Sequence, residues 1–441
     1  MATDTPAEDR NPSDSSAAPP AAGPQPAGRL RDVPYMGVIW VVDEAVKLGF
    51  ENGHPDWCNL GQGQPEVGEL PGAPPRISTL ALRPEDHAYG PLGGTLELRT
   101  AIAEHYNRLY RRGAATQYGP RNVAVAQGGR LALSRAMAAL AAGSVGYQVP
   151  DYTAYQDMFE LHLSRLVPRL LPTREADGHR FDLALFEREA RAGLSALLLS
   201  NPCNPTGQVL RGEELQRLLS IGRRHGTLLL LDEFYSHFIF DRGDDGRWGP
   251  GAGPVSAAAH VGDIEQDPVL IFDGLTKNHR YPGWRVGWVV GPEALVETIA
   301  RVASSLDGGP SRLAQRAALE ALQPETADRE TAAVRAAFAI KRNLMVAALR
   351  RMGVHLPVEP QSTFYAWGRL PAQFPEALEF FRRALARRVL TVPGAFFDVN
   401  PGALRPGPSP FGNWMRFSFG PPEANLRLGL SRLEAMVAES R

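Results

Sequence analysis

The segment FDGLTKNHRYPGWRVGW, residues 272–288, places a lysine directly after an apolar run. The run VLIFDGL (269–275) has the composition of a buried strand, and the small residues at its end indicate a turn. Lys277 is therefore expected at a strand end. A solvated surface lysine is the ordinary alternative, but a lysine whose pKa is lowered by its surroundings becomes a nucleophile. Lys277 is thus the first candidate functional residue.

Similar apolar runs recur through the middle of the chain, at NVAVAQ, SVGYQVP, ALLLS, TLLLLDE and VGWVVG. Between them lie segments with apolar residues at helical spacing, such as LALSRAMAALAAG and GEELQRLLSIGRRHG. Fully apolar strands that alternate with helices indicate an α/β fold with a mostly parallel sheet covered on both faces. Ligands bind such sheets at the carboxyl ends of the strands, which is where Lys277 is expected.

The composition is that of an ordinary globular protein, with 44% hydrophobic and 22% charged residues over 441 positions. The formal net charge is -1, from 47 basic and 48 acidic side chains, so neither nucleic acid nor a membrane surface is an expected partner. Two cysteines form no disulfide framework and no metal-binding spacing, and no metal site is expected. We find no signal peptide and no apolar run long enough to span a membrane, so the cytoplasm is the expected location.

Four regions are expected along the chain. Residues 1–32 are a Pro/Ala-rich tail with too little apolar surface to become ordered. Residues 33–75 form an N-terminal arm that begins with a partly apolar helix and belongs in part to a small domain. Residues 76–306 form the large domain. Residues 307–441 form a smaller α+β domain, which opens with a long helical region.

Three segments resemble, in their order and spacing, the class I/II aminotransferases of fold type I, which depend on pyridoxal 5'-phosphate (PLP). They are SNPCNPTGQVL (200–210), LLLLDEFYSHF (228–238) and the 272–288 segment. The resemblance extends from about residue 33 to the C-terminus. It implies a large domain built on a mostly parallel, seven-stranded sheet between helices, and a smaller α+β domain. It also implies PLP as cofactor, L-amino acids and 2-oxo acids as substrates, and a homodimer with shared active sites.

The resemblance assigns roles around the lysine. Lys277, preceded by Thr276, matches the lysine that carries PLP as a Schiff base. Arg285, eight residues later, matches the arginine that pairs with the cofactor phosphate. A guanidinium suits that role because it bonds phosphate oxygens in a bidentate way.

Three further residues match groups that bond the cofactor ring. Asp232 ends the run LLLLD, where a buried carboxylate is unfavourable unless something compensates it. In the resemblance, the protonated ring nitrogen of PLP does so, whereas a helix cap or a surface carboxylate is the alternative. Tyr235 and Asn204 match the two residues that bond the ring oxygen of the cofactor.

The segment AVAQGGRLAL (124–133) resembles the strand-turn-helix whose first backbone amides receive the phosphate. Gly128, Gly129 and Arg130 fall at the turn, and an ordinary loop turn is the alternative. Many relatives have a small or hydroxyl residue where Arg130 stands, so its side chain either bridges the phosphate or points into solvent. Tyr152, in VPDYTAY, matches the aromatic residue that stacks on the PLP ring. Tyr89, in HAYGPLGG, matches a tyrosine that reaches the phosphate of the neighbouring subunit.

Two residues match the site for the substrate's α-carboxylate. Arg416, in NWMRFSFG, matches the arginine that binds this group, and Gly63, in LGQGQPE, matches a loop glycine whose backbone faces it. Asn204 lies in the same part of the site. An arginine on the solvent side of an alternating strand is the other interpretation of Arg416.

The specificity for the substrate side chain stays open. Arg312 lies in the stretch where dicarboxylate-specific relatives carry a further arginine. The residues that follow the lysine, His279, Arg280 and Tyr281, either line the pocket or pack its turn. Tyr35, Met36 and Ile39 suggest an apolar wall, and with it an aliphatic or aromatic amino donor, if the N-terminal helix closes over the site.

Transamination by a ping-pong mechanism is the expected reaction, with Lys277 first holding the cofactor and then acting as the general base. The same scaffold also supports β- or γ-lyases, cyclases or synthases, and oxidases that act on amino acids. A PLP-binding transcriptional regulator is a remote alternative. It needs a folded, basic DNA-binding domain before the enzyme-like part, and this chain has an acidic Pro/Ala-rich tail there.

Overall fold

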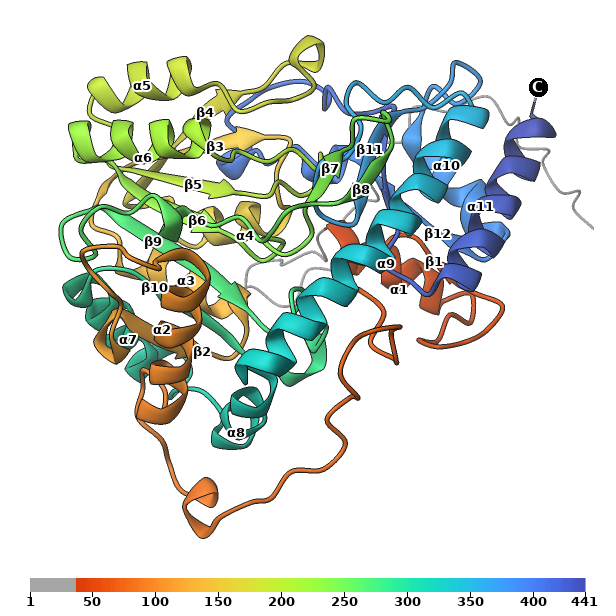
Figure 1. Cartoon of the computed structure of the whole chain (residues 1–441). Helices are drawn as coiled ribbons and strands as arrows, with labels where there is room; N and C mark the ends of the chain where they lie inside the picture. Colours follow the sequence, from red (N-terminus) through yellow and green to blue (C-terminus); the bar gives the residue numbers. More distant parts are fainter. Residues whose placement is uncertain (1–36, 441) are drawn as a thin grey trace, which may run out of the picture. The chain divides into compact units, whose positions relative to one another are not determined.

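The structure is a computed structural model that describes residues 37–440 (Figure 1). Its largest sheet has seven strands, in the order β2 (Val123–Ala126), β10 (Gly287–Val290), β9 (Val269–Gly274), β6 (Leu228–Asp232), β5 (Ala196–Ser200), β3 (Gly143–Val149) and β4 (Leu166–Pro172). Strand β10 is antiparallel to both of its neighbours, and the other neighbouring strands pair in parallel. The predicted mostly parallel, seven-stranded sheet is confirmed.

Alternate residues of the central strands pack into two different hydrophobic cores. In β6, Leu230 belongs to one core, whereas Leu229 and Leu231 belong to the other. In β9, Leu270 belongs to the same core as Leu230, and Ile271 belongs to the other core. Because successive side chains of a strand point to opposite faces, both faces of this sheet are buried. This burial explains why the strands have unbroken apolar sequences.

Helices cover both faces of the sheet (Figure 1). The core that contains Leu230 includes side chains from α3 (Gly129–Ala139), α4 (Ala154–Glu160) and α7 (Glu293–Leu306). The opposite core includes side chains from α2 (Leu96–Tyr110), α5 (Leu183–Arg191), α6 (Glu213–His225) and α8 (Arg312–Ala321). The helices predicted at LALSRAMAALAAG and GEELQRLLSIGRRHG are α3 and α6.

A second group of elements is built mainly from the C-terminal part of the chain. Strands β11 (Tyr365–Arg369), β14 (Trp414–Ser418) and β13 (Val392–Pro393) form an antiparallel sheet, and β1 (Cys58–Asn59) pairs in parallel with β12 (Val389–Leu390). The helices here are α1 (Gly37–Val46), α9 (Pro324–Arg351), α10 (Ala377–Ala386) and α11 (Glu423–Ala438). The predicted long helical region after residue 307 is thus two helices, α8 and α9.

Smaller elements occupy the connections. Strands β7 (Phe240–Arg242) and β8 (Trp248–Pro250) form a hairpin. Short 3-10 helices lie at Pro84–His87, Pro120–Asn122, Glu175–Asp177, Ala257–Ala259, Pro282–Trp284, Gly394–Phe397 and Pro401–Ala403. Within residues 37–440 no helix is long and apolar enough to cross a membrane. The predicted tail at residues 1–32 lies outside the described residues, and the predicted divisions at residues 75 and 306 stay predictions.

The carboxyl edge of the large sheet gathers most of the predicted functional residues. Asp232 is the last residue of β6, and Lys277 follows the end of β9. Asn204 lies in the loop after β5, Tyr152 follows β3, and Gly128 follows β2. Since parallel strands bring their carboxyl ends to one edge, residues far apart in the sequence meet there.

Candidate active site

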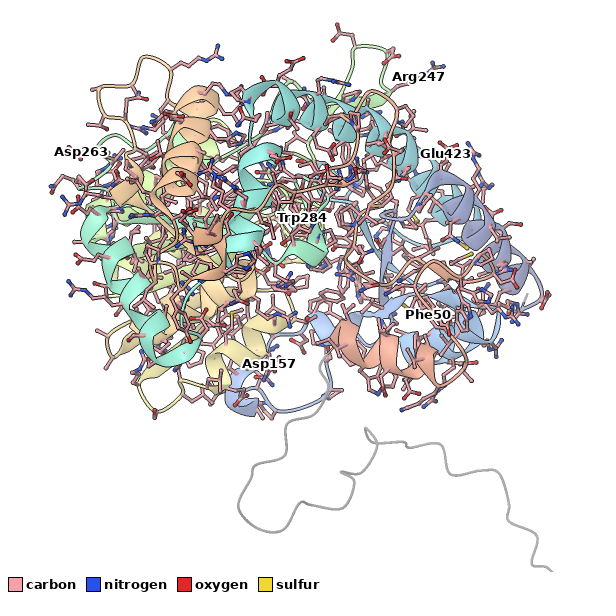
Figure 2. The ribbon with its side chains drawn as sticks, turned by 90° about the horizontal axis from the view of Figure 1, so that it is seen from below. Phe50, Asp157, Arg247, Asp263, Trp284 and Glu423 are labelled. Carbon is pink, nitrogen blue, oxygen red and sulfur yellow. The ribbon has the colours of Figure 1, made fainter. Side chains whose placement is uncertain are left out.

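A cavity of about 350 Å³ opens at this edge of the sheet. It is bounded by the loops after the strands, by α1 and α4, and by strands β11 and β14 of the C-terminal sheet. Asp157 of α4, labelled in Figure 2, lines the cavity together with Val38 and Ile39 of α1. The predicted site residues that line the cavity are Gly63, Gly129, Arg130, Tyr152, Asn204, Asp232, Tyr235, Thr276, Lys277, Arg285 and Arg416.

Lys277 is unlike the other two lysines of the chain, Lys47 and Lys341, because it alone of the three lines the cavity. Its ammonium donates to the carbonyl of Gly63. Burial lowers the pKa of Lys277 to about 7, and the positive charge of Arg285 adds to this effect. A large fraction of this amine is therefore neutral near pH 7, which is the form that attacks a carbonyl carbon.

Asp232 is a buried carboxylate held by neutral donors. The hydroxyl of Tyr155 donates to its Oδ2 at 2.9 Å, and the amide of Phe234 donates to its Oδ1 at 3.4 Å. Burial raises the pKa of Asp232 to about 6, although the Tyr155 bond, the Phe234 bond and the charge of Lys277 oppose this shift. Asp232 has no ion pair within the described residues. A cationic group bound in the cavity would compensate the buried charge.

The turn between β2 and α3 presents hydrogen-bond donors to the cavity. Gly128 has a φ of 87°, a conformation that favours glycine, and the absence of a Cβ atom there leaves room for the guanidinium of Arg285. The first amides of α3 have no acceptor within their own helix. The buried hydroxyl of Thr276 has no hydrogen-bond partner in the described residues. Such donors at a helix N-terminus suit a phosphate.

Two guanidinium groups stand beside these donors. Arg130 donates to the hydroxyl of Tyr152 at 2.9 Å, and Arg285 donates to the carbonyl of Pro282 at 3.1 Å. Burial, followed by the charge of Arg130, lowers the pKa of Arg285. An anion between the two side chains would relieve this repulsion. The donors and charges of this region therefore fit the phosphate group of PLP, and Arg130 lines the cavity although its side chain is still exposed to solvent.

Arg416 is buried on β14 with neutral acceptors. One nitrogen donates to Oδ1 of Asn204 at 2.9 Å, another donates to the carbonyl of Gly61, and Nε has no partner within the described residues. Burial lowers its pKa. No acidic side chain of the described residues pairs with it. The bond from Arg416 leaves Asn204 its amide nitrogen as a donor. A buried guanidinium without a counterion is suited to bind a carboxylate.

Several cavity residues carry no clear signal in the sequence. Tyr155 of α4 does not itself line the cavity, but it lies behind the lining residue Asp232, to which its hydroxyl donates. Tyr365 bonds Tyr235 across the cavity but belongs to the C-terminal sheet, and no local pattern links the two. The remaining lining residues that sequence reasoning did not single out are Val38, Gln62, Leu133, Thr153, Ala154, Asp157, Ser200 and Phe234.

Tyr89 and Arg312 lie away from the cavity. The side chain of Tyr89 is fully exposed, and its carbonyl accepts a hydrogen bond from Arg312 at 3.4 Å. Within this chain, therefore, neither side chain reaches Lys277 or Arg416. The predicted contact of Tyr89 with a neighbouring subunit stays a prediction.

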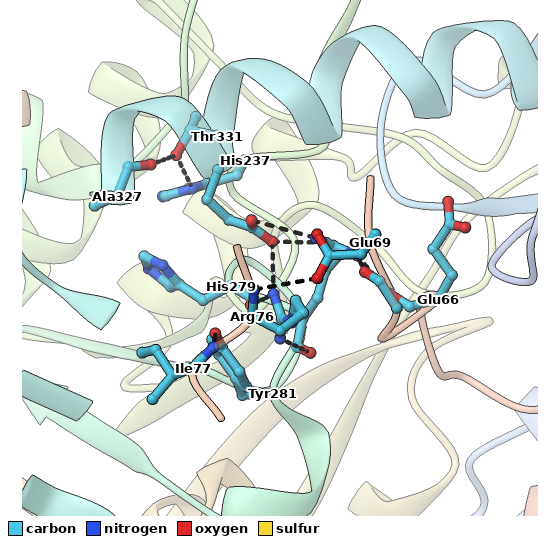
Figure 3. Close-up of polar contacts among 12 residues, drawn as sticks. Glu66, Glu69, Arg76, Ile77, His237, His279, Tyr281, Ala327 and Thr331 are labelled. Atoms are coloured by element: carbon cyan, nitrogen blue, oxygen red, sulfur yellow. Dashed lines mark hydrogen bonds and ion pairs between the residues drawn. The ribbon is translucent and has the colours of Figure 1, made fainter. Parts of the chain in front are cut away.

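A network of buried charges holds the loop that carries Gly63 (Figure 3). Arg280 donates to the carbonyls of Glu66 and Gly68, at 3.0 and 2.8 Å, and to the carboxylate of Glu330 on α9 at 2.6 Å. Arg76 also reaches Glu330, at 3.4 Å. The network thus joins the loop beside Lys277, the loop around Gly63, and α9.

The residues that follow the Lys277 turn are His279, Arg280 and Tyr281, and none of them lines the cavity. They pack around the turn instead. His279 is buried against the rings of His105 and His237, at 5.9 and 5.5 Å between ring centroids. Arg280 belongs to the network described above. Tyr281 stacks on Trp284 with ring centroids 3.7 Å apart, and Trp284 is labelled in Figure 2. Of the two interpretations left open by the sequence, the structure supports packing.

Comparison with known proteins identifies the family. Residues 55–433 match the family model for aminotransferase class I and II. A probable aspartate/prephenate aminotransferase of Thermus aquaticus is 28% identical over 380 residues, which are 86% of this chain and 90% of that protein. An LL-diaminopimelate aminotransferase of Moorella thermoacetica is 26% identical over 361 residues, which are 80% of this chain and 86% of that protein.

Solved structures agree. A mutant aspartate aminotransferase of Thermus thermophilus has a TM-score of 0.73 at 25% identity and covers 92% of this chain and 97% of its own. An aromatic aminotransferase of Pyrococcus horikoshii has a TM-score of 0.71 at 25% identity, covering 90% and 99%. The fold is therefore that of a PLP-dependent transferase of fold type I. The chain belongs to the aminotransferase class I and II family, and its reaction is amino-group transfer. The lyase, cyclase and oxidase alternatives are not favoured.

We predict that Glu330→Gln strongly destabilises the protein. The change leaves the Arg280 guanidinium, which is 0% exposed, without its counterion. Breaking a buried pair in this way typically costs about 3–5 kcal/mol. The matched control is Glu297→Gln, which breaks an exposed pair with Arg301 on α7 and should cost below about 1 kcal/mol. Urea unfolding of the two variants measures the difference. Equal losses of unfolding free energy would show that the buried network does not stabilise this loop.

Proposed function

We propose that the cavity binds PLP on Lys277 and carries out amino-group transfer between an L-amino acid and a 2-oxo acid. The observation that carries this proposal is that one cavity holds a lysine with a lowered pKa together with a buried carboxylate and a cluster of anion-binding donors. When bound, PLP supplies an electron sink that stabilises negative charge at the substrate's α-carbon. The residues of the chain provide binding, orientation and proton transfer.

Two sets of residues in the cavity would hold two different parts of the cofactor. The amides after Gly128, the hydroxyl of Thr276, and the guanidinium groups of Arg130 and Arg285 bind the phosphate. Asp232 would pair with the ring nitrogen and keep it protonated. Tyr155 holds that carboxylate in place by its hydrogen bond of 2.9 Å.

Three side chains act on the ring itself. Tyr152 lines the cavity, and its ring would stack on the cofactor. Tyr235 and the amide nitrogen of Asn204 donate to the ring oxygen. Since both donors favour a negative charge on this oxygen, they lower the proton affinity of the lysine-cofactor linkage.

Arg416 binds the α-carboxylate of the substrate, which gives this buried guanidinium the counterion that the described residues do not supply. The backbone of Gly63 lies beside the same position. The amine of Lys277, once released from the cofactor, takes the proton from the substrate's α-carbon as the general base. Its pKa of about 7 suits a group that must both accept and return a proton near neutral pH.

The wall formed by α1 favours an apolar amino donor. Val38 and Ile39 line the cavity from this helix, and Leu133 of α3 lines it as well. These side chains offer no charge to a substrate carboxylate or ammonium group. A panel of L-amino acids in the half-reaction tests whether aliphatic or aromatic donors are preferred. Tyr35 and Met36, which the sequence suggested for the same wall, lie outside the described residues.

We further propose that the enzyme is a homodimer in which Tyr89 of one subunit reaches the phosphate site of the other. Tyr89 is fully exposed on a segment that extends from the sheet between residues 76 and 95 (Figure 1). Leu82 of this segment and Leu96, the first residue of α2, are also exposed. Exposed apolar side chains of this kind are typical of a surface that a second subunit covers.

The pH dependence of PLP uptake tests the state of Lys277. Below pH 7 most of this amine is protonated and cannot attack the aldehyde, because its pKa is about 7. We expect the rate of uptake by the apoenzyme to rise about tenfold per pH unit below pH 7 and to level off above it. The visible absorption of lysine-bound PLP follows the reaction. Nα-acetyl-lysine, with an ordinary pKa of about 10.4, serves as the control for titration of PLP itself. A rate that climbs in parallel with this control up to pH 9 would contradict a lowered pKa.

Arg416→Lys tests the carboxylate site. The lysine keeps the charge but loses the bidentate geometry, so we expect kcat/KM for the amino donor to fall at least about 30-fold, with PLP still bound. The exposed Arg427→Lys is the matched control and should behave like the wild type. An amine that matches this donor but lacks the α-carboxylate should react equally slowly with Arg416→Lys, with Arg427→Lys and with the wild type. If Arg416→Lys slows this amine as much as the amino acid, Arg416 does not act on the carboxylate.

A further inference from the structure

Two tyrosine hydroxyls meet inside the cavity. Tyr235 follows β6 of the large sheet, whereas Tyr365 is the first residue of β11 in the C-terminal sheet. Their hydroxyl oxygens lie 2.8 Å apart, and their ring centroids lie 5.4 Å apart. Both side chains are buried, with 5% and 0% exposure. The two phenols therefore form one hydrogen-bonded unit that joins the two sheets.

Tyr365 contacts the neighbouring parts of the site as well. A Cβ atom at Gly63 would lie 2.5 Å from its hydroxyl oxygen, so this hydroxyl packs directly against the backbone of the loop that accepts the Lys277 bond. The guanidinium carbon of Arg416 lies over the face of the Tyr365 ring, 4.1 Å from the ring centroid. Tyr365 is thus adjacent to the residues proposed to act on cofactor and substrate.

The hydrogen-bond roles within the pair follow from the single proton of each phenol. If Tyr235 donates its proton to the ring oxygen of PLP, its own oxygen can only accept. Tyr365 must then be the donor in the pair. Its hydroxyl has no other hydrogen-bond partner within the described residues. A donor that itself accepts a hydrogen bond is polarised and donates more strongly.

We propose that Tyr365 is a positioning residue whose hydroxyl donates to Tyr235 and thereby fixes Tyr235 as a donor to the ring oxygen of PLP. This inference rests on the proposed function. Tyr365 acts on the cofactor only through Tyr235. Its hydroxyl favours the state in which the ring oxygen is negative and the nitrogen of the lysine-cofactor linkage has lost its proton. The linkage therefore gives up that proton at a lower pH when the pair is intact.

Tyr365→Phe tests this role, because it removes the hydroxyl and keeps the ring against Arg416. We expect the pKa of the lysine-cofactor linkage to rise by roughly 0.3–1 unit, the scale of one hydrogen bond. The measurement is a pH titration of the visible absorption of the PLP-loaded enzyme without substrate. Tyr118→Phe is the matched control, since Tyr118 is also a buried tyrosine but lies in the core on the other face of the sheet. It should leave the pKa unchanged.

A double-mutant cycle shows whether Tyr365 acts through Tyr235. Tyr235→Phe alone should raise the linkage pKa more than Tyr365→Phe does, because it removes the direct donor. In the Tyr235→Phe background, Tyr365→Phe should then add no shift. Two shifts that simply add would overturn the proposal, since they would show that Tyr365 acts on the cofactor directly.

The outcomes separate this inference from the proposed function. If the wild type gives no visible PLP absorption, or if Lys277→Ala keeps it, the proposed function fails. If the wild type titrates normally and Tyr365→Phe leaves the pKa within about 0.1 unit, the proposed function stands and the role of Tyr365 is wrong. Circular dichroism of each variant verifies that the change is not a loss of folding.

Discussion

The concentration of positive charge around Lys277 is the constraint on which the rest of the site depends. Arg130, Arg285 and Arg416 all lie near this lysine, and each lowers its pKa by its charge. Asp232 is the buried carboxylate that opposes them. Arg416 and Asp232 are buried, and buried charges are unfavourable unless they are compensated. A phosphate beside two of the arginines, a substrate carboxylate beside the third, and a cationic ring nitrogen beside Asp232 would complete the balance.

The fold makes this concentration of charge feasible. The parallel strands bring Asp232 and the Lys277 loop to one edge of the large sheet, whereas Arg416 comes from a strand of the C-terminal sheet. Tyr365, from the same smaller sheet, bonds Tyr235 and packs on Arg416. The buried pair of Arg280 and Glu330 holds the intervening loop. The cavity is thus lined by groups from both sheets.

The sequence predicted the parts of this arrangement that are local. Lys277 and Asp232 follow apolar runs, and a strand end is the place where a parallel sheet exposes such residues. The sheet itself was predictable because strands buried on both faces have unbroken apolar sequences. Tyr365 could not be found in this way, since its contact with Tyr235 depends on how the second sheet packs. The packing of His279 and its neighbours likewise depends on α2 and α9, which lie far away in the sequence.

The chain offers an unusually direct test of the central claim, because it contains three lysines, Lys47, Lys277 and Lys341. The measurement is reduction of the PLP-loaded enzyme with borohydride, followed by proteolysis and mass spectrometry of the three lysine-containing peptides. The account predicts a phosphopyridoxyl group on Lys277 alone. Lys341 should stay unmodified although it is buried, because it pairs with Glu66 outside the cavity, and exposed Lys47 should stay unmodified as well. A stoichiometric adduct on Lys47 or Lys341, with Lys277 unmodified, would contradict the account.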